Sequence, residues 1–137
     1  KVHPGGSIGK KMYLRVSDIY KFNEKPEVDI KSTVSEVITE ISSKRLGATA
    51  VLDNEKLKGI ITDGDIRRML QDNPEDISKL SAKEMMSGSP KSVCPDTLAV
   101  NAFKLMEKNN ITQVIVKENE KYLGMVHLHD FIKEGIV

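Results

Sequence analysis

An internal duplication constrains the fold of this 137-residue chain more than any other feature. A glycine, two hydrophobic residues and a polar turn that leads into a hydrophobic helix stand at Gly59–Asp65, and the arrangement returns at Gly124–Asp130. Such a repeat indicates two copies of one unit, each too small to be stable alone. The pairs that we align are Pro26 with Pro90, Thr33 with Thr97, Gly59 with Gly124 and Asp65 with Asp130. Their offset is 64 residues before the hairpin and 65 after it, which predicts one inserted residue in the hairpin turn.

Each copy is predicted to run strand, helix, strand, strand, helix. In the first copy, Thr33 and Glu36 form a capping box that starts a helix, whose apolar side chains recur at helical spacing up to Ile41, and Gly47 is a plausible stop. Two strands at Ala48–Leu52 and Leu57–Thr62 then form a hairpin. A helix follows, with Ile66, Met69 and Leu70 on one face.

The second copy repeats this pattern, and a short helix precedes each copy. Thr97 is predicted to cap its first helix, strands follow at Thr112–Val116 and Tyr122–Val126, and Leu128–Glu134 closes the chain. The short lead-in helices are expected at Val16–Tyr20 and at Ala82–Met86, the latter after a capping box at Ser81 and Glu84. The expected fold is α+β, with the repeats packed sheet against sheet about a pseudo-twofold axis and two equivalent clefts.

Composition and charge narrow the partners. With 21 basic and 20 acidic residues interspersed, 4% aromatic residues and no tryptophan, the chain lacks the footprint of a nucleic-acid-binding protein. No apolar run approaches the roughly 20 residues of a membrane span. Cys94 is predicted to be a small buried hydrophobe, which fits a reducing cytoplasm. The Lys1 start predicts a piece of a longer protein, with a tail at 1–15, a first repeat at 16–74, and a connector plus second repeat at 75–137.

The repeats resemble a tandem pair of CBS (cystathionine-β-synthase) domains over residues 16–134. The resemblance depends on the pattern Gly-hydrophobic-hydrophobic-Thr-x-x-Asp at Gly59–Asp65 and on its half-repeat at Gly124–Asp130. It implies a regulatory module that binds adenine nucleotides or related anions in its clefts, with no required cofactor.

A narrower resemblance, to bacterial arabinose-5-phosphate isomerases, comes from His3-Pro4-Gly5-Gly6, from Thr62–Arg68 and from His127–Asp130. Those enzymes join a sugar-isomerase (SIS) domain to a CBS pair and act in the pathway to the lipopolysaccharide sugar Kdo. The resemblance implies that His3 belongs to a catalytic site whose other residues lie upstream, so this fragment is expected to be inactive. It also implies CMP-Kdo as an alternative ligand, the SIS domain as a partner, and a homo-oligomer formed through the CBS helices.

Two interpretations of the first turn stay open. A helix N-terminus favours anions, a threonine hydroxyl can donate to a phosphate, and an aspartate can accept from ribose hydroxyls, which makes Thr62, Asp63 and Asp65 candidate ligand residues. Thr-x-x-Asp is equally a helix cap. Arg67 and Arg68 either clamp a phosphate or carboxylate or form a solvated face.

The second turn offers His127, His129 and Asp130 as candidates. Because histidine is not a preferred cap, His127 is expected to contact an anion or a partner domain instead, and to make cleft occupancy depend on pH. Three metal ligands in one short stretch would converge poorly, so no metal is expected. Two other functions stay open: an oligomerisation module with empty clefts, and the CBS pair of an unrelated enzyme or transporter.

Overall fold

The computed structural model describes residues 12–72 and 75–136. The elements of the first half are α2 (Ser17–Tyr20), β1 (Glu27–Asp29), α3 (Val34–Lys44), β2 (Ala48–Asp53), β3 (Lys56–Thr62) and α4 (Asp63–Asp72). A connector follows, with a 3-10 turn (Ile77–Lys79), α5 (Ala82–Met85) and β4 (Ser87–Gly88). The elements of the second half are β5 (Ser92–Val93), α6 (Ala99–Asn109), β6 (Gln113–Glu118), β7 (Lys121–His127) and α7 (Leu128–Lys133). The α+β class and the order of elements predicted from the sequence are confirmed.

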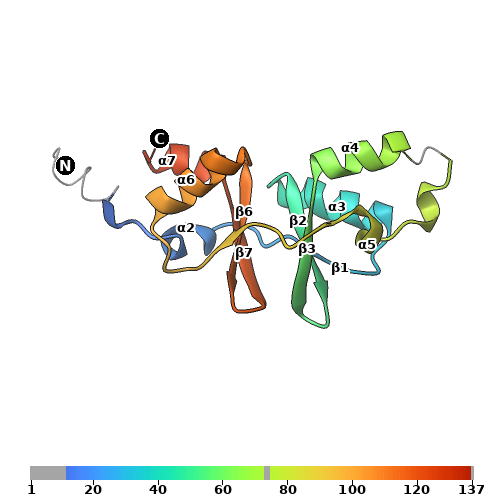
Figure 1. Cartoon of the computed structure of the whole chain (residues 1–137), viewed down its shortest axis with the longest axis horizontal. Helices are drawn as coiled ribbons and strands as arrows, with labels where there is room; N and C mark the ends of the chain where they lie inside the picture. Colours follow the sequence, from blue (N-terminus) through green and yellow to red (C-terminus); the bar gives the residue numbers. More distant parts are fainter. Residues whose placement is uncertain (1–11, 73–74, 137) are drawn as a thin grey trace.

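The strands form two matching groups. Their order is β1-β2-β3-β7-β6-β5, in which β1 runs parallel to β2, β5 runs parallel to β6, and each hairpin is antiparallel. The groups meet between β3 and β7 at the single pair Lys56 and Lys121. This palindromic order is what a pseudo-twofold arrangement of two repeats produces. Figure 1 shows the hairpins side by side, with α3 and α4 outside one and α6 and α7 outside the other.

The predicted capping box at Thr33 is confirmed. Glu36 N–H donates to Thr33 Oγ1 at 3.2 Å, and Thr33 N–H donates to Glu36 Oε1 at 2.8 Å. Two helical N–H groups that would lack partners are thereby satisfied. The helix ends at Lys44, and Arg45 follows in the left-handed conformation. Gly47, the predicted stop, lies in the turn that leads to β2, with φ of +72°.

The repeat has one offset throughout, and the predicted insertion in the hairpin turn is wrong. Helices α3 and α6 each span 11 residues, their N-caps are Thr33 and Leu98, and both end on a left-handed residue, Arg45 or Asn110. The offset is therefore 65 before the hairpin as well as after it. The prediction that Thr97 caps α6 is also wrong, because its hydroxyl accepts from the Cys94 N–H at 3.1 Å.

The lead-in helices are exchanged between the repeats. Helix α2 precedes the first repeat but contacts the second, where Val16 N–H donates to the Thr97 carbonyl at 2.9 Å. Helix α5 precedes the second repeat but contacts the first, where Ala82 N–H donates to the Ser32 carbonyl at 2.8 Å. Figure 1 shows α2 on the side of β6 and β7, and α5 on the side of β2 and β3. Neither repeat can therefore leave the other without losing part of its own core.

Three hydrophobic clusters make up the core. One lies in the first repeat with α5, one in the second repeat with α2, and the third joins β2 to β6 and β7, which confirms the packing of sheet against sheet. The methionines Met69, Met85 and Met106 are buried, as predicted. Cys94 is exposed, so its prediction as a buried residue is wrong: it precedes the turn into α6 and points away from the cluster that holds Val93.

Candidate functional site

The first turn, where β3 ends and α4 begins, is a reciprocal helix cap. Thr62 N–H donates to Asp65 Oδ2 at 2.9 Å, and Asp65 N–H donates to Thr62 Oγ1 at 3.2 Å. The cap interpretation of Thr-x-x-Asp is thus confirmed. The Asp65 side chain is 11% exposed, and its Oδ1 accepts from Arg68 Nη2 at 2.5 Å.

A cleft of about 330 Å³ opens beside this cap, and we call it the first cleft. Arg68, rather than the predicted Arg67, belongs to its lining, and Lys91 adds a second cationic side chain. The cleft also has apolar walls from both repeats, including Ile60 and Ile111. The full lining is Ile60, Thr62, Asp65, Arg68, Ser87–Lys91, Ile111 and Gln113.

A second hollow of about 350 Å³ lies at the same helix start and shares Thr62, Ile111 and Gln113 with the first cleft. Asp63 and Gly64 line this hollow together with Gly47 and the loop at 110–112. Asp63 N–H donates to the Gly47 carbonyl at 3.2 Å, so this amide already has a partner. The structure thus places Thr62 between two hollows, Asp65 in one and Asp63 in the other.

The second turn has the same cap geometry with different chemistry. His127 N–H donates to Asp130 Oδ2 at 2.7 Å, and His129 N–H donates to His127 Nδ1 at 3.0 Å. The prediction that His127 would not cap the helix is therefore wrong, because an imidazole nitrogen also accepts a hydrogen bond. The two imidazole rings lie 4.5 Å apart, centroid to centroid. Burial, with a smaller contribution from His129, lowers the pKa of His127, and the Asp130 carboxylate partly offsets this.

One residue that sequence reasoning missed contacts Asp130. Asn23 Nδ2 donates to Asp130 Oδ2 at 2.9 Å and to the Met125 carbonyl at 3.1 Å. The residue 65 positions later is Gly88, which lines the first cleft. Only the corrected offset aligns these two residues, so the alignment with an insertion could not have found Asn23.

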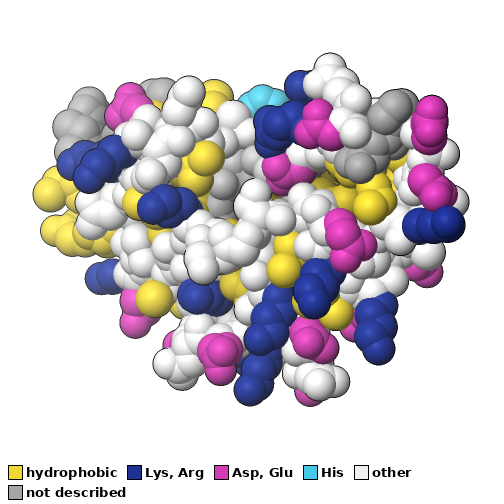
Figure 2. Space-filling model, turned by 45° about the vertical axis from the view of Figure 1, so that its right-hand side comes forward, with side chains coloured by type: hydrophobic (Ala, Val, Ile, Leu, Met, Phe, Trp, Pro, Cys, Tyr) yellow, Lys and Arg dark blue, Asp and Glu magenta, His cyan; other side chains and the backbone are white. Residues whose placement is uncertain are grey.

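Two other expectations concern metal and catalysis. Within residues 12–72 and 75–136 there is no group of three or more His, Cys, Asp or Glu side chains that could hold a metal ion. His3 lies outside the described residues, so its role stays a prediction. None of the helices in the described part of the chain is long and apolar enough to cross a membrane. Figure 2 shows basic and acidic side chains interspersed over the visible face, which agrees with the balanced charge of the sequence.

The interlocked repeats and the cleft at a strand-to-helix junction define a duplicated α+β module. A family model described as the CBS domain matches residues 16–72 and again residues 82–136. The chain belongs to the CBS-domain family, as a tandem pair.

Curated relatives extend this assignment. The chain is 42% identical over 137 residues to arabinose 5-phosphate isomerase KdsD of Salmonella typhi, a match that covers 98% of this chain and 42% of the relative. It is 41% identical over 133 residues to KdsD of Francisella tularensis, covering 96% of this chain and 40% of the relative. The chain therefore spans about two fifths of the length of these relatives.

Solved structures share the fold at low sequence identity. A CBS-domain containing protein of Agrobacterium tumefaciens superposes with a TM-score of 0.80 at 18% identity, covering 99% of this chain and 100% of that one. A CBS domain protein of Pyrobaculum aerophilum complexed with AMP gives 0.75 at 22% identity, covering 86% and 90%. A hexameric CBS-CP12 protein from bloom-forming cyanobacteria gives 0.75 at 19% identity, covering 88% and 67%.

Proposed function

We propose that this chain is the regulatory CBS pair of an arabinose-5-phosphate isomerase and that its first cleft binds a nucleotide. The candidates are an adenine nucleotide and a nucleotide-activated sugar such as CMP-Kdo. The observation that carries the proposal is the first cleft itself, which combines an aspartate, a threonine and two cationic side chains with apolar walls. The Pyrobaculum CBS protein, whose structure contains AMP, supports a nucleotide over other anions.

Each part of a nucleotide has a complementary group in the first cleft. Ile60, Pro90 and Ile111 provide apolar contact for a base. Asp65 can accept from the ribose hydroxyls, while Arg68 and Lys91 supply positive charge for the phosphate. The Arg68 side chain is 66% exposed, so it can turn from Asp65 to a phosphate without leaving a buried charge unpaired.

The cap does not consume the hydrogen-bonding capacity that the ligand needs. Thr62 Oγ1 accepts from the Asp65 N–H, so its hydroxyl proton stays available for a phosphate oxygen. The Asp65 carboxylate has about four lone-pair sites, of which the Thr62 N–H and Arg68 use two. The same two side chains can therefore start the helix and hold a nucleotide.

Regulation follows if the ligand prefers one arrangement of the repeats over another. The first cleft is lined from both repeats, because Ile111 and Gln113 come from the second, so a bound nucleotide touches both. We propose that the complete protein joins this pair to an SIS domain in the cytoplasm and interconverts ribulose 5-phosphate and arabinose 5-phosphate. In this proposal His3 belongs to the isomerase site.

Isothermal titration calorimetry with AMP and with CMP-Kdo tests the binding proposal. The wild-type chain should bind one of them, and Thr62→Val should weaken that ligand about tenfold because it removes the donor to the phosphate. Thr62→Ser, which keeps the hydroxyl, is the matched control and should bind as the wild type does. Equal affinity for Thr62→Val would remove Thr62 from the site.

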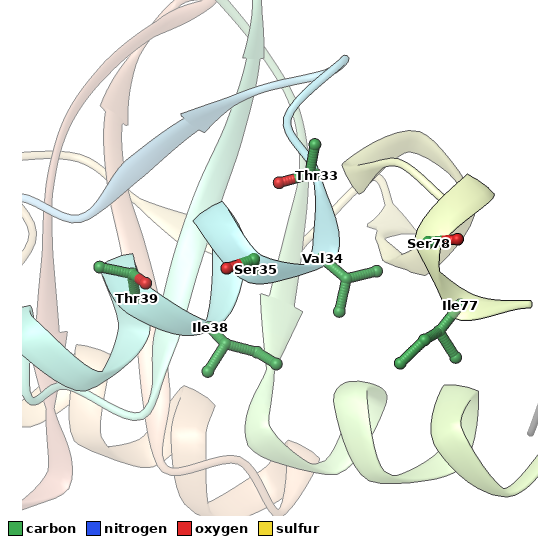
Figure 3. Close-up of a pocket in the computed structure, with 7 residues that line it drawn as sticks. All are labelled: Thr33, Val34, Ser35, Ile38, Thr39, Ile77 and Ser78. Carbon is green, nitrogen blue, oxygen red and sulfur yellow. The ribbon is translucent and has the colours of Figure 1, made fainter.

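A second candidate function, an oligomerisation module with empty clefts, is favoured by one apolar groove. This groove has a volume of about 560 Å³ and lies between α3 and the 3-10 turn, where Figure 3 shows Val34, Ile38 and Ile77 pointing into the same space. Ile38 is 39% exposed. The hexameric CBS-CP12 protein supports assembly as a property of related modules. No binding heat with either ligand, together with an Ile38→Asp variant of lower molar mass in light scattering, would favour this function.

A further inference from the structure

The two capping aspartates have different neighbours, and this difference separates the two repeats at their candidate sites. Asp65 has Arg68 beside it, and position 88 across the first cleft is a glycine. Asp130, 65 residues later, accepts from the Asn23 side chain. The position in the second repeat that corresponds to the first cleft, at Met125, His127 and Asp130, is called the second-cleft position below.

Gly88 leaves the first cleft open. It lies exposed in β4, and a Cβ added there would meet nothing within 4 Å. Asn23, at the corresponding position, is half-buried and places its amide on the groups that a ribose would use. Its Nδ2 donates both to Asp130 Oδ2, at 2.9 Å, and to the Met125 carbonyl, at 3.1 Å.

We infer that Asn23 closes the second-cleft position and that this CBS pair binds a single nucleotide, in the first cleft. The inference rests on the proposed function. A nucleotide at the second-cleft position has to displace two Asn23 hydrogen bonds, and a ribose, which would replace the one on Asp130, leaves the Met125 carbonyl without that donor. Two hydrogen bonds of ordinary strength correspond to an affinity about tenfold to a hundredfold weaker than at an unobstructed site.

The closure also places the His127 hypothesis on a different footing. The imidazole caps α7 through Nδ1, and the Asp130 carboxylate beside it is held by Asn23. Titration of His127 therefore affects ligand occupancy only in a variant that lacks the Asn23 side chain.

Calorimetric stoichiometry with AMP, and separately with CMP-Kdo, tests this inference. The wild-type chain should bind one molecule. Asn23→Gly, which copies Gly88 into the second repeat, should bind a second one. Gly88→Asn, which copies Asn23 into the first cleft, should weaken the single wild-type site at least tenfold. Circular dichroism confirms that each variant is folded.

The outcomes separate this inference from the proposed function. Two molecules bound by the wild type, or one by both the wild type and Asn23→Gly, would overturn the closure and leave the proposed function standing. No binding by the wild type and one molecule bound by Asn23→Gly would support the closure and refute binding in the first cleft. No binding by either chain would refute both.

A measurement without ligand checks the contact itself. The Asn23 side-chain amide resonance in a ¹H–¹⁵N spectrum should move as the Asp130 carboxyl titrates, because the amide donates to that carboxylate. The movement should vanish in Asp130→Asn. An Asn23 resonance that does not respond to the carboxyl would overturn the inference whatever the calorimetry gives.

Discussion

The two repeats share a backbone plan but not the chemistry at the ends of their strands. Helices α3 and α6 match in length and in the conformation of both ends, and both hairpins have a register shift at the same place, after Val51 and after Val116. The caps of α4 and α7 have the same geometry, yet one uses Thr62 and the other His127. A cap needs only an acceptor and a carboxylate, so the geometry persists while the side chain that could meet a ligand changes.

The cores differ as well, and this difference gives the largest predicted effect. Phe131 of α7 is fully buried, whereas Ile66, its equivalent in α4, is only partly buried. Phe131→Ala should lower the free energy of unfolding by about 3–5 kcal/mol, because it leaves a large cavity next to Phe103. Ile66→Ala should cost about 2 kcal/mol, at the low end of its class, because water already reaches the site. Urea denaturation followed by circular dichroism measures both.

Since the lead-in helices tie the repeats together, both variants should unfold in one transition. Two transitions in Phe131→Ala, or equal losses in the two variants, would contradict this view of one interlocked core.

The next prediction tests the corrected register. Thr33→Ala should cost about 1 kcal/mol, because it removes the side-chain acceptor of the α3 cap. Thr97→Ala should cost about half as much, because its hydroxyl serves only the turn at Cys94 and Leu98 is the N-cap of α6. Thermal unfolding of the two alanine variants, with Thr33→Ser as control, measures this. Equal losses would restore the equivalence of Thr33 and Thr97.

The fold could be predicted from the sequence because its information is local and repeated. The capping box at Thr33, the hairpin around Asp53–Lys56 and the apolar periodicity of α3 each indicate an element without any long-range contact. The register of the repeat could not be predicted, since Thr97 looks like a cap and only its hydrogen bond to Cys94 reveals the difference. The exchange of α2 and α5 is a long-range contact that no local pattern encodes.

The candidate site was predicted less completely. The motif identified Thr62 and Asp65 correctly as the start of α4, but not which arginine faces the cleft: Arg68 contacts Asp65 because they lie three residues apart on the helix. Asn23 went unnoticed because it is 107 residues from Asp130 in sequence.

A smaller effect is predicted for an ion pair found in one repeat. Lys44 Nζ lies 2.9 Å from Glu40 Oε2 in α3, whereas the equivalent positions in α6 are Asn109 and Leu105, joined by an amide-to-carbonyl hydrogen bond of 2.8 Å. Lys44→Gln should cost about 0.3–0.5 kcal/mol, and the difference should shrink in high salt. Asn109→Ala is the control, whose effect should not depend on salt. Chemical denaturation with urea at two salt concentrations measures both, and a loss that is the same at both would exclude the ion pair.

The smallest predicted effect is a pH dependence that only the second repeat should have. Burial lowers the pKa of His127 in the folded state, and protonation of Nδ1 would remove the acceptor for the His129 N–H. The unfolded chain therefore binds the proton more readily than the folded chain does, and stability rises with pH across this interval. The contribution should be fully present above the ordinary histidine pKa of about 6.5 and lost as the pH falls through the lowered folded value.

Urea titrations between about pH 5 and pH 8 measure this slope, and His127→Thr is the matched variant, since it places the Thr62 cap in the second repeat. His127→Thr should be less pH-dependent than the wild type over this interval and at least as stable at its acid end. His129→Gln, which keeps the His127 cap, should retain most of the slope. Identical pH profiles for the wild type and His127→Thr would show that the imidazole cap does not distinguish the two repeats energetically.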